Sequence, residues 1–371
     1  MTAQVTRFFG DKMKNTFPVY YKKFTCIADR CTDTCCAGWA VVADGESLEK
    51  YNNVSGNFGK KIQSVINIDE DGDTVFTPVS NRCPFLLDSG LCEMYIELGH
   101  ESLCRTCRQY PRHITYFGAR SETGISLSCP EAARIIMECS EPITFETENT
   151  LDFPQPTDID PELYFTLLEA RKKAIDILQN REFPISERIC SFLGFSSDIA
   201  PHVRRYEYNE IRAAIGSDYF VKEKPVYSRK KENGATKKYF SDFRSLEMLD
   251  SLWKERLSDA ENADTVKYFK SNPDIDWEYE HLMVYFVFRY FMTAVFDRDL
   301  LSKSKLAAVS FIIIRKLCAA QNADKEKRTQ IMQRYSKEVE HSASNMEFLN
   351  ITMKKSRFYS IENLINIIRG E

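Results

Sequence analysis

Cysteine is the residue type in this sequence whose number and spacing point to chemistry. Ten of the twelve cysteines lie in the first 139 of 371 residues. The first cluster has the spacing C-x4-C-x3-C-C and consists of Cys26, Cys31, Cys35 and Cys36. The second ends in C-x2-C and consists of Cys83, Cys92, Cys104 and Cys107, and Cys129 follows as a ninth cysteine. Thiolate sulfur selects zinc or iron–sulfur clusters over hard cations, and a four-coordinate site needs ligands from short, turn-rich segments. The pattern therefore predicts a metal site, with a redox dithiol at Cys35-Cys36 or at Cys104 and Cys107 as an alternative.

The beginning of the chain indicates the compartment. Met1 to Lys23 is polar and charged and lacks the apolar segment of a secretory signal. We therefore expect a cytoplasmic location, where clustered cysteines are more often metal ligands than disulfides. A disulfide-stapled protein remains as an alternative. No run approaches the roughly 20 apolar residues of a membrane span, because Arg289 interrupts the nearest candidate, residues 282–296.

The charge balance excludes some classes of partner. Fifty Lys and Arg residues against 54 Asp and Glu residues give a formal net charge of -4, so no global basic field attracts nucleic acid or a membrane surface. One basic stretch, residues 222–244, surrounds Asn233-Gly234, a pair typical of β-hairpins and loops. This stretch is interpreted as a solvated surface loop or as a docking surface for an acidic protein.

The elements that must position the cysteines differ between the two parts of the chain. Residues 1–140 are rich in turn patterns, residues 141–160 form an acidic, proline-containing stretch that predicts a linker, and residues 161–371 show helical periodicity. The first helix of this last part follows Asp160-Pro161, a cap followed by proline at the first helical position. Further helices are predicted at residues 204–215, 243–257, 277–296, 303–320, 325–341 and 360–368.

These patterns predict the fold class and domain organisation. We expect a mainly α protein, in which an irregular cysteine-rich metal-binding N-terminal domain (1–140) precedes an all-helical C-terminal domain (161–371) that recognises a substrate or partner.

Common catalytic motifs are missing from the sequence. It contains no G-x-G-x-x-G after a strand, no P-loop, no G-x-S-x-G and no H-E-x-x-H. The C-x3-C of Cys31 and Cys35 does not complete the usual radical S-adenosylmethionine motif, because Gly38 stands where the third cysteine belongs.

Several ordered motifs nevertheless carry a family resemblance. They are C-x4-C-x3-C-C-x-G-W at 26–39, Asp44, C-P-F-L-x4-L-C at 83–92, Leu98-Gly99, T-C-x-x-Y-P-R at 106–112 and L-S-C-P-E at 127–131. Over residues 21–134 the sequence thereby resembles the flagellin lysine N-methylase family. A subset of the motifs is also similar to small zinc- or iron-chelating proteins. That subset supports an alternative function, a non-enzymatic metal-chelating or electron-transfer protein.

The resemblance implies a protein-lysine N-methyltransferase that moves a methyl group from S-adenosylmethionine to lysine side chains of flagellin. It also implies an iron–sulfur cluster of the 4Fe–4S type, with zinc as the alternative metal, and leaves the catalytic and donor-binding residues unknown. The ligands carried over by position are Cys26, Cys31, Cys35, Cys36, Cys83, Cys92, Cys107 and Cys129. Cys104 is less secure as a ligand, and Cys139, Cys190 and Cys318 lie outside the matching motifs.

The implied reaction places demands on the site. A lysine must lose a proton before its nitrogen attacks the methyl group, because the pKa of a lysine ammonium in water is about 10.4. Aromatic side chains stabilise a cationic donor, and a Tyr, Glu or Asp accepts the proton. The segment Trp277–Tyr290 offers such groups, although its residues are more typical of a core helix with a few polar edges. The implied iron–sulfur cluster has either a structural role in folding the N-terminal domain or a catalytic role.

Overall fold

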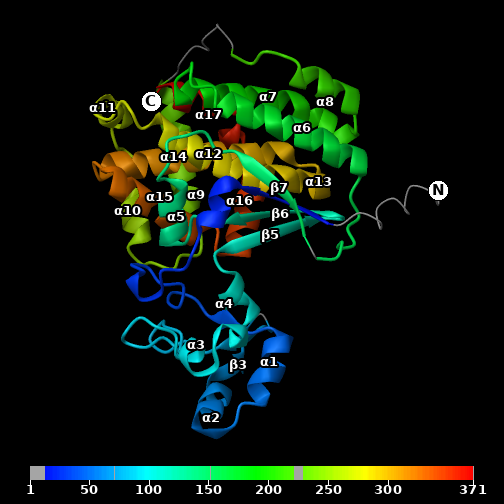
Figure 1. Cartoon of the computed structure of the whole chain (residues 1–371). Helices are drawn as coiled ribbons and strands as arrows, with labels where there is room; N and C mark the ends of the chain where they lie inside the picture. Colours follow the sequence, from blue (N-terminus) through cyan, green and yellow to red (C-terminus); the bar gives the residue numbers. More distant parts are fainter. Residues whose placement is uncertain (1–12, 71, 151, 221–228, 371) are drawn as a thin grey trace, which may run out of the picture.

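The computed structural model describes residues 13–70, 72–150, 152–220 and 229–370. A large helical body, a four-stranded sheet beside it and a small cysteine-rich lobe follow one another in space (Figure 1). The expectation of a mainly helical fold is confirmed for the described residues. No helix among them is both long and apolar enough to cross a membrane.

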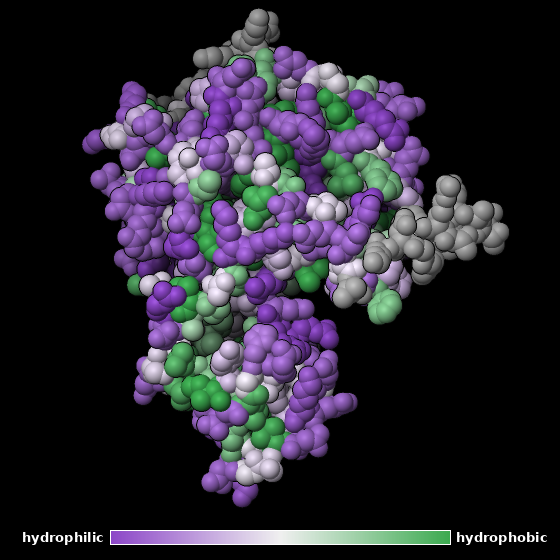
Figure 2. Space-filling model, viewed as in Figure 1, coloured by the Kyte–Doolittle hydropathy of each residue, from purple (hydrophilic) through white to green (hydrophobic). Residues whose placement is uncertain are grey.

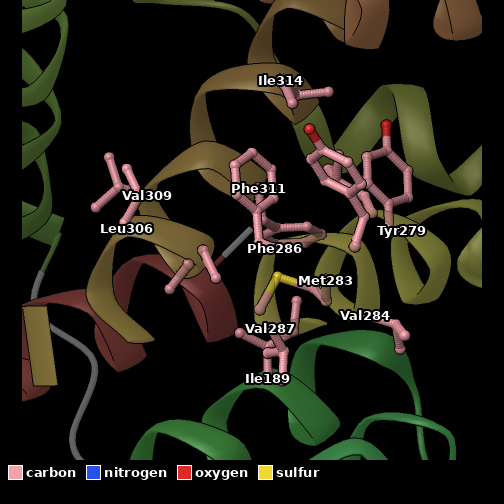
Figure 3. Packing of buried hydrophobic residues seen from close by; sticks show 14 of the residues in the cluster. Ile189, Tyr279, Met283, Val284, Phe286, Val287, Leu306, Val309, Phe311 and Ile314 are labelled. Atoms are coloured by element: carbon pink, nitrogen blue, oxygen red, sulfur yellow. The ribbon is translucent and has the colours of Figure 1, made fainter. Parts of the chain in front are cut away.

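The helical body is built around α14, a 21-residue helix that is buried along nearly its whole length. Residues of α12 and α7 pack against it, and the ring centroids of Tyr279 and Phe311 lie 5.3 Å apart (Figure 3). The helices are α6 (Pro161–Leu178), α7 (Ile185–Arg205), α8 (Tyr208–Ile215), α9 (Arg229–Arg244), α10 (Trp253–Ala260), α11 (Thr265–Lys270), α12 (Asp276–Tyr290), α13 (Ala294–Asp297), α14 (Leu300–Ala320), α15 (Lys325–Val339), α16 (Ala343–Lys355) and α17 (Ile361–Gly370).

The start of α6 shows how the local sequence fixes a helix. The Asp160 carboxylate accepts a hydrogen bond from the Leu163 backbone N–H at 2.7 Å, and Pro161 occupies the first helical position. A carboxylate at this position satisfies a free N–H and interacts favourably with the positive end of the helix dipole. The predicted helix start is therefore confirmed, and the apolar residues that follow face the core.

A four-stranded sheet lies between the body and the lobe, in the order β5-β6-β1-β7. Its strands are β1 (Lys14–Pro18), β5 (Arg112–Phe117), β6 (Arg120–Ile125) and β7 (Phe145–Asn149). Strand β1 is parallel to β6 and antiparallel to β7. The cysteine-rich part is thus more regular than predicted, and β7 lies within the predicted linker 141–160. β5 and β6 form a local hairpin, but β1 pairs with β6 and β7 across more than 100 residues, which explains why local patterns did not reveal the whole sheet.

The small lobe has its own hydrophobic cluster, which contains Tyr51, Phe76 and Phe85. Its elements are α1 (Gly45–Asn52), α2 (Gly56–Val65), α3 (Glu93–Leu98), α4 (Arg105–Gln109) and a sheet of β2 (Val41–Val42), β3 (Ile66–Ile68) and β4 (Thr74–Phe76). Figure 2 shows this lobe projecting from the body, with hydrophobic residues among the polar ones on the visible face. The predicted division at residue 140 stays a prediction. The second, larger hydrophobic cluster runs from Tyr20 to Ile368 and includes residues of both predicted domains.

Asp44 holds the beginnings of two lobe helices together. Its carboxylate accepts from the Ser47 N–H at the start of α1 and, at 2.7 Å, from the Arg105 N–H at the start of α4. Partial burial alone would raise the pKa of Asp44, but these hydrogen bonds outweigh it and lower the pKa to about 2. The carboxylate is therefore charged at neutral pH, and it fixes α4, which carries Cys107.

Three local predictions for the helical part are wrong. The Asn233-Gly234 pair lies inside α9 instead of forming a hairpin or loop, because the following residues Tyr239 and Phe240 are completely buried and packing overrides turn propensity. The helix predicted at 204–215 is interrupted at Tyr206, which has a positive φ of 57°. The helix predicted at 243–257 is two helices, α9 and α10. Residues 222–228 of the basic stretch lie outside the described residues.

Candidate functional site

A cleft of about 360 Å³ lies where the cysteine-rich segments meet the sheet and the helical body. Such a volume falls within the range of small-ligand pockets. The cysteine-rich side of the cleft includes Cys35, Cys36, Trp39, Thr106, Cys107 and Tyr110. The sheet and helical side includes His113, Ser126, Ser128, Arg289, Glu340 and His341.

One carboxylate attaches the first cysteine loop to the helical body. Asp33, between Cys31 and Cys35, accepts hydrogen bonds from Lys337 Nζ at 2.6 Å and Gln333 Nε2 at 2.8 Å, both on α15. Gln333 Nε2 also donates to the carbonyl oxygen of Ser128 at 2.7 Å. The Lys337 side chain is only 4% exposed, so this pair is shielded from solvent. These contacts join the first cysteine loop and Ser128, which lines the cleft, to α15.

Aromatic side chains form part of the cleft wall. The ring centroids of Trp39 and Tyr110 lie 5.8 Å apart, and Lys337 Nζ lies 5.0 Å from the Trp39 ring centroid. Burial raises the pKa of the Tyr110 hydroxyl above its usual range, and that hydroxyl lies 3.1 Å from Ser128 Oγ. Tyr110 is therefore a neutral hydrogen-bonding group at neutral pH. An electron-rich wall of this kind favours cationic ligands.

The helical wall contains a buried charged network around Glu340. This carboxylate is 1% exposed and accepts from Arg289 Nε at 3.1 Å, the Tyr290 hydroxyl at 2.5 Å and the Tyr285 hydroxyl at 3.1 Å. Burial raises the pKa of both tyrosines, that of Tyr285 to about 12. Burial would lower the pKa of Arg289, but Tyr285, Tyr290 and Glu340 raise it well above its usual value. The network therefore places a fixed carboxylate–guanidinium pair at the cleft.

Two histidines at the cleft differ in their surroundings. Burial and the nearby Arg289 guanidinium hold the pKa of His113 well below its usual value, and His113 Nδ1 lies 3.5 Å from Arg289 Nη1. The His113 ring also packs against Gly124, where an added Cβ would come within 2.6 Å of it. His341 has two buried ring nitrogens, and neither has a hydrogen-bond partner. His113 is thus a fixed neutral group with an unpaired Nε2, and His341 has two unpaired ring nitrogens.

The nine cysteines of the predicted metal site fall into two neighbouring groups. Two cysteines are assigned to the same group when they lie close enough for the negative charges of their thiolates to repel each other. The first group is Cys26, Cys31, Cys35 and Cys129. The second group is Cys36, Cys83, Cys92, Cys104 and Cys107. Both groups meet at the adjacent pair Cys35-Cys36, which lines the cleft together with Cys107.

Short helices and turns position these thiols. Cys92, Cys104 and Cys129 precede the first residues of α3, α4 and α5 (Pro130–Ile136) respectively. The backbone N–H groups at those helix starts lower the pKa of the three thiols and so favour the thiolate form, whereas burial raises it. A backbone hydrogen bond of 2.7 Å from the Cys83 N–H to the Cys36 carbonyl joins the two clusters of the sequence.

The protonation of the thiols follows from burial and mutual repulsion. Burial raises the pKa of Cys83 to about 12 and that of Cys129 to about 11. A hydrogen bond between the Cys35 and Cys36 thiols raises the pKa of Cys35 and lowers that of Cys36, and Cys107 and Cys104 behave in the same way. The groups therefore resist accumulating negative charge unless a cation compensates it.

The donor set fits a thiolate-ligated metal, since all twelve cysteines are free and nine of them are neighbours. The side chains do not form a closed cage. Among the residues that the structure describes, no three His, Cys, Asp or Glu side chains converge closely enough to hold a metal ion. The structure thus brings the predicted ligands together as neighbouring groups.

The structure also places the cysteines that the sequence left less secure. Cys104 is 1% exposed and hydrogen-bonded to Cys107, so it belongs to the second group. Cys139 is exposed, whereas Cys190 and Cys318 are buried in the hydrophobic core of the helical body.

Several residues of the cleft carried no sequence signal. Glu340 and His341 follow α15 as an ordinary acidic residue and a lone histidine, and only their place in the fold distinguishes them. The predicted segment Trp277–Tyr290 contributes Tyr285 and Tyr290 to the network, but its side chains are mostly buried in the core. Trp39 and Tyr110 already stood within the motifs at 26–39 and 106–112, where they accompany the cysteines.

Comparisons with known proteins agree with the motifs. Residues 171–367, just over half of the chain, match the family described as FliB lysine N-methylase C-terminal domain. Over 135 residues the chain is 28% identical to "Lysine-N-methylase" of Salmonella typhimurium, a match covering 33% of this chain and 32% of the relative. The same share of this chain is 28% identical to "Flagellar biosynthetic protein FliU" of Salmonella muenchen, over 76% of that protein. The match therefore spans about a third of the length of the lysine-N-methylase. No solved structure matches the chain.

Proposed function

Because the chain belongs to the family of FliB lysine N-methylases, we propose that it transfers a methyl group from S-adenosylmethionine to lysine side chains of flagellin. The observation that carries this proposal is the cleft at the junction of the lobe and the helical body. Both the sulfonium donor and the lysine substrate carry positive charge, and the cleft offers aromatic faces to such ligands.

The chemistry requires a neutral lysine nitrogen aligned with the donor methyl group. In-line attack forms the N–C bond while the S–C bond breaks, and the sulfonium sulfur keeps the electron pair. Withdrawal from water disfavours the charged ammonium and so lowers the pKa of the lysine. In the proposed arrangement Trp39 and Tyr110 supply this environment, and the cleft would hold both reactants in one geometry.

The metal site forms the second part of the proposal. The cysteines that would hold an iron–sulfur cluster, of the 4Fe–4S type, or alternatively zinc, are the eight predicted ligands together with Cys104. When bound, such a group would tie together the irregular cysteine segments and, if it contains iron, would supply a redox-active centre beside the cleft. Its position follows from Cys35, Cys36 and Cys107, which line the cleft.

The direct test is incubation of anaerobically purified protein with flagellin and S-adenosylmethionine, followed by peptide mass spectrometry. We expect lysine-containing flagellin peptides to gain mass in steps of one methylene group, and the gain to require the donor. Heat-inactivated protein and a lysine-rich protein unrelated to flagellin serve as controls. Unmodified flagellin after incubation with metal-loaded protein would contradict the proposal.

Replacement of Trp39 by leucine is expected to weaken binding of S-adenosylmethionine by about 2- to 30-fold, which corresponds to the roughly 0.5–2 kcal/mol of a cation–π contact. Binding of the uncharged product S-adenosylhomocysteine should change less, because its sulfur carries no charge. Isothermal titration calorimetry measures both affinities.

Trp277→Leu is the matched control. Trp277 likewise has a lysine over its ring, with Lys325 Nζ at 5.1 Å, but it lies outside the residues that line the cleft. A sulfonium site at Trp39 would be contradicted if both substitutions weakened binding of S-adenosylmethionine equally. It would also be contradicted if Trp39→Leu weakened binding of S-adenosylmethionine and S-adenosylhomocysteine equally.

A non-enzymatic metal-chelating or electron-transfer protein is the second candidate. The observation in its favour is the gathering of five neighbouring thiols, which includes Cys83 and Cys92 on the lobe. This alternative predicts stoichiometric metal without saturable binding of S-adenosylmethionine, so the same calorimetric titration separates the two functions.

A further inference from the structure

Arg112 is a cation of the cleft wall that lacks an acidic partner. It is the first residue of β5, which follows α4 of the lobe, so it stands where the sheet adjoins the lobe (Figure 1). It is partly buried and lines the cleft. Among the residues that the structure describes, no carboxylate pairs with the Arg112 side chain, and no hydrogen bond engages its guanidinium. Because an opposite charge offsets the cost of withdrawing a cation from water, an unpaired guanidinium in a pocket indicates an anionic group on the ligand.

Two aromatic rings hold this guanidinium in place. Its central carbon lies 5.0 Å from the ring centroid of Phe24 and 6.0 Å from that of Tyr21. Phe24 is 6% exposed and belongs to the large hydrophobic cluster. The backbone of Arg112 is paired with Ile125 in the ladder between β5 and β6. Stacking on aromatic rings orients the planar fork of arginine and leaves its N–H donors free for a carboxylate.

The other charged side chains of the cleft already have partners. Arg289 Nε donates to Glu340 at 3.1 Å, and Arg289 Nη1 donates to the Tyr285 hydroxyl at 2.8 Å. Among the described residues that line the cleft, Glu340 is the only Asp or Glu, and it is 1% exposed. The cleft therefore has one guanidinium more than it has carboxylates, and the excess positive charge is that of Arg112.

We propose that Arg112 binds the α-carboxylate of the methyl donor, S-adenosylmethionine. This inference rests on the proposed function. The donor carries a sulfonium, an ammonium and a carboxylate, so the carboxylate is its only anionic group. The guanidinium fork donates two parallel hydrogen bonds to the two oxygens of a carboxylate, a geometry that an ammonium does not reproduce. Arg112 thus binds the donor and takes no part in the bond changes of methyl transfer.

The spacing of the cleft residues fits the dimensions of the donor. Tyr110 and Arg112 are separated only by Pro111, which also lines the cleft. Two residues of extended chain span at most about 7 Å, and the four covalent bonds from the sulfonium sulfur to the carboxyl carbon span about 5 Å. A donor with its sulfonium against the rings of Trp39 and Tyr110 therefore reaches Arg112 with its carboxylate. Contacts at both ends of this part of the donor fix the direction of the methyl group.

The test combines two proteins with two ligands in isothermal titration calorimetry without flagellin. The ligands are S-adenosylmethionine and its decarboxylated form, which keeps the sulfonium and the ammonium. Hydrogen bonds between charged groups contribute about 10- to 100-fold in affinity, so we expect Arg112→Met to bind S-adenosylmethionine that much more weakly than the wild type. It should bind the decarboxylated form no more than about threefold more weakly, because that ligand lacks the group that couples to Arg112. Arg112→Lys should bind S-adenosylmethionine with intermediate affinity, since lysine keeps the charge but not the fork.

Arg120→Met is the matched control. Arg120 is the first residue of β6 and also lies over an aromatic ring, with its guanidinium carbon 5.3 Å from the ring centroid of Phe165. Because β5 and β6 are antiparallel, Arg120 stands at the opposite end of the hairpin from Arg112, outside the residues that line the cleft. Arg120→Met should therefore bind S-adenosylmethionine as the wild type does.

The outcomes separate this inference from the proposed function. Wild-type affinity of Arg112→Met for S-adenosylmethionine would overturn the role of Arg112, and so would equal weakening for both ligands, which indicates a structural effect. Reduced metal content in Arg112→Met would also overturn it, by assigning the charge of Arg112 to the cysteine thiolates. A wild-type protein that binds S-adenosylmethionine but never methylates flagellin would overturn the proposed function alone. No saturable binding of S-adenosylmethionine by the metal-loaded wild type would overturn both.

Discussion

Replacement of Glu280 by alanine is expected to lower the free energy of unfolding by about 3–5 kcal/mol, the cost of leaving a buried charge without its partner. Glu280 lies on α12 and is completely buried. It accepts from Arg188 Nη1 at 2.5 Å and from Arg181 Nε at 2.9 Å. Arg188 is only 2% exposed, so after the substitution its guanidinium would remain in the core with only a 3.8 Å contact to the Asp276 carboxylate and a bond to the Leu178 carbonyl.

Denaturant unfolding followed by circular dichroism measures this loss. Asp176→Ala is the control, because Asp176 and Lys172 form an ion pair on α6 whose side chains are 56% and 78% exposed. Solvent screening limits such a pair to about 0–1 kcal/mol. Glu280→Gln should lose less than Glu280→Ala, since an amide oxygen still accepts a hydrogen bond. Similar losses for Glu280→Ala and Asp176→Ala would show that the Glu280 network does not stabilise the body.

Removal of the proposed metal is expected to unfold the small lobe while the helical body stays folded. The buried cluster of the lobe consists of only eight residues, and small cores rarely suffice without a metal or disulfides. Structural zinc in small domains contributes about 10–16 kcal/mol of apparent binding free energy, which is also folding free energy. Hydrogen exchange measured by mass spectrometry, before and after anaerobic chelation, should show loss of protection in residues 41–107 and little change in α12 and α14.

Cysteine variants separate ligands from bystanders. Cys92→Ala and Cys104→Ala should lower the metal content and destabilise the lobe, because both thiols belong to the second group. Cys318→Ala should keep the metal and cost no more than a small core cavity, and Cys139→Ala should change little because Cys139 is exposed. Metal analysis with an ultraviolet–visible spectrum distinguishes iron–sulfur from zinc. Equal metal content in all four variants would contradict the assignment.

Local sequence patterns correctly predicted helices that are determined by nearby residues, such as a cap or a helical repeat of apolar positions. α6 begins at its predicted cap, and the predicted helices at 303–320 and 325–341 correspond to α14 and α15 within a few residues. Predictions failed where distant residues decide the structure. α9 contains Asn233-Gly234 because its buried residues pack on other helices, and β1 pairs with β6 across about a hundred residues of intervening chain.

The candidate site was predictable only in part, for the same reason. The nine cysteines and the aromatic residues Trp39 and Tyr110 stand in recognisable motifs. The grouping of the cysteines needed the fold, because members of each group come from separate segments, as Cys31 and Cys129 show. Glu340 and His341 were invisible in the sequence, since neither their residue types nor their spacing is distinctive.

The sequence by itself determined the family resemblance, the candidate cysteine ligands and most helices, because these depend on residue types at short, fixed spacings. Only the tertiary structure revealed the cleft at which reactants are proposed to bind. Asp33 and Lys337 are 304 positions apart, yet their 2.6 Å contact joins the cysteine loop to α15. The cleft exists because such long-range contacts bring Cys35-Cys36 to the same place as Glu340 and His341, and no local pattern encodes that distance.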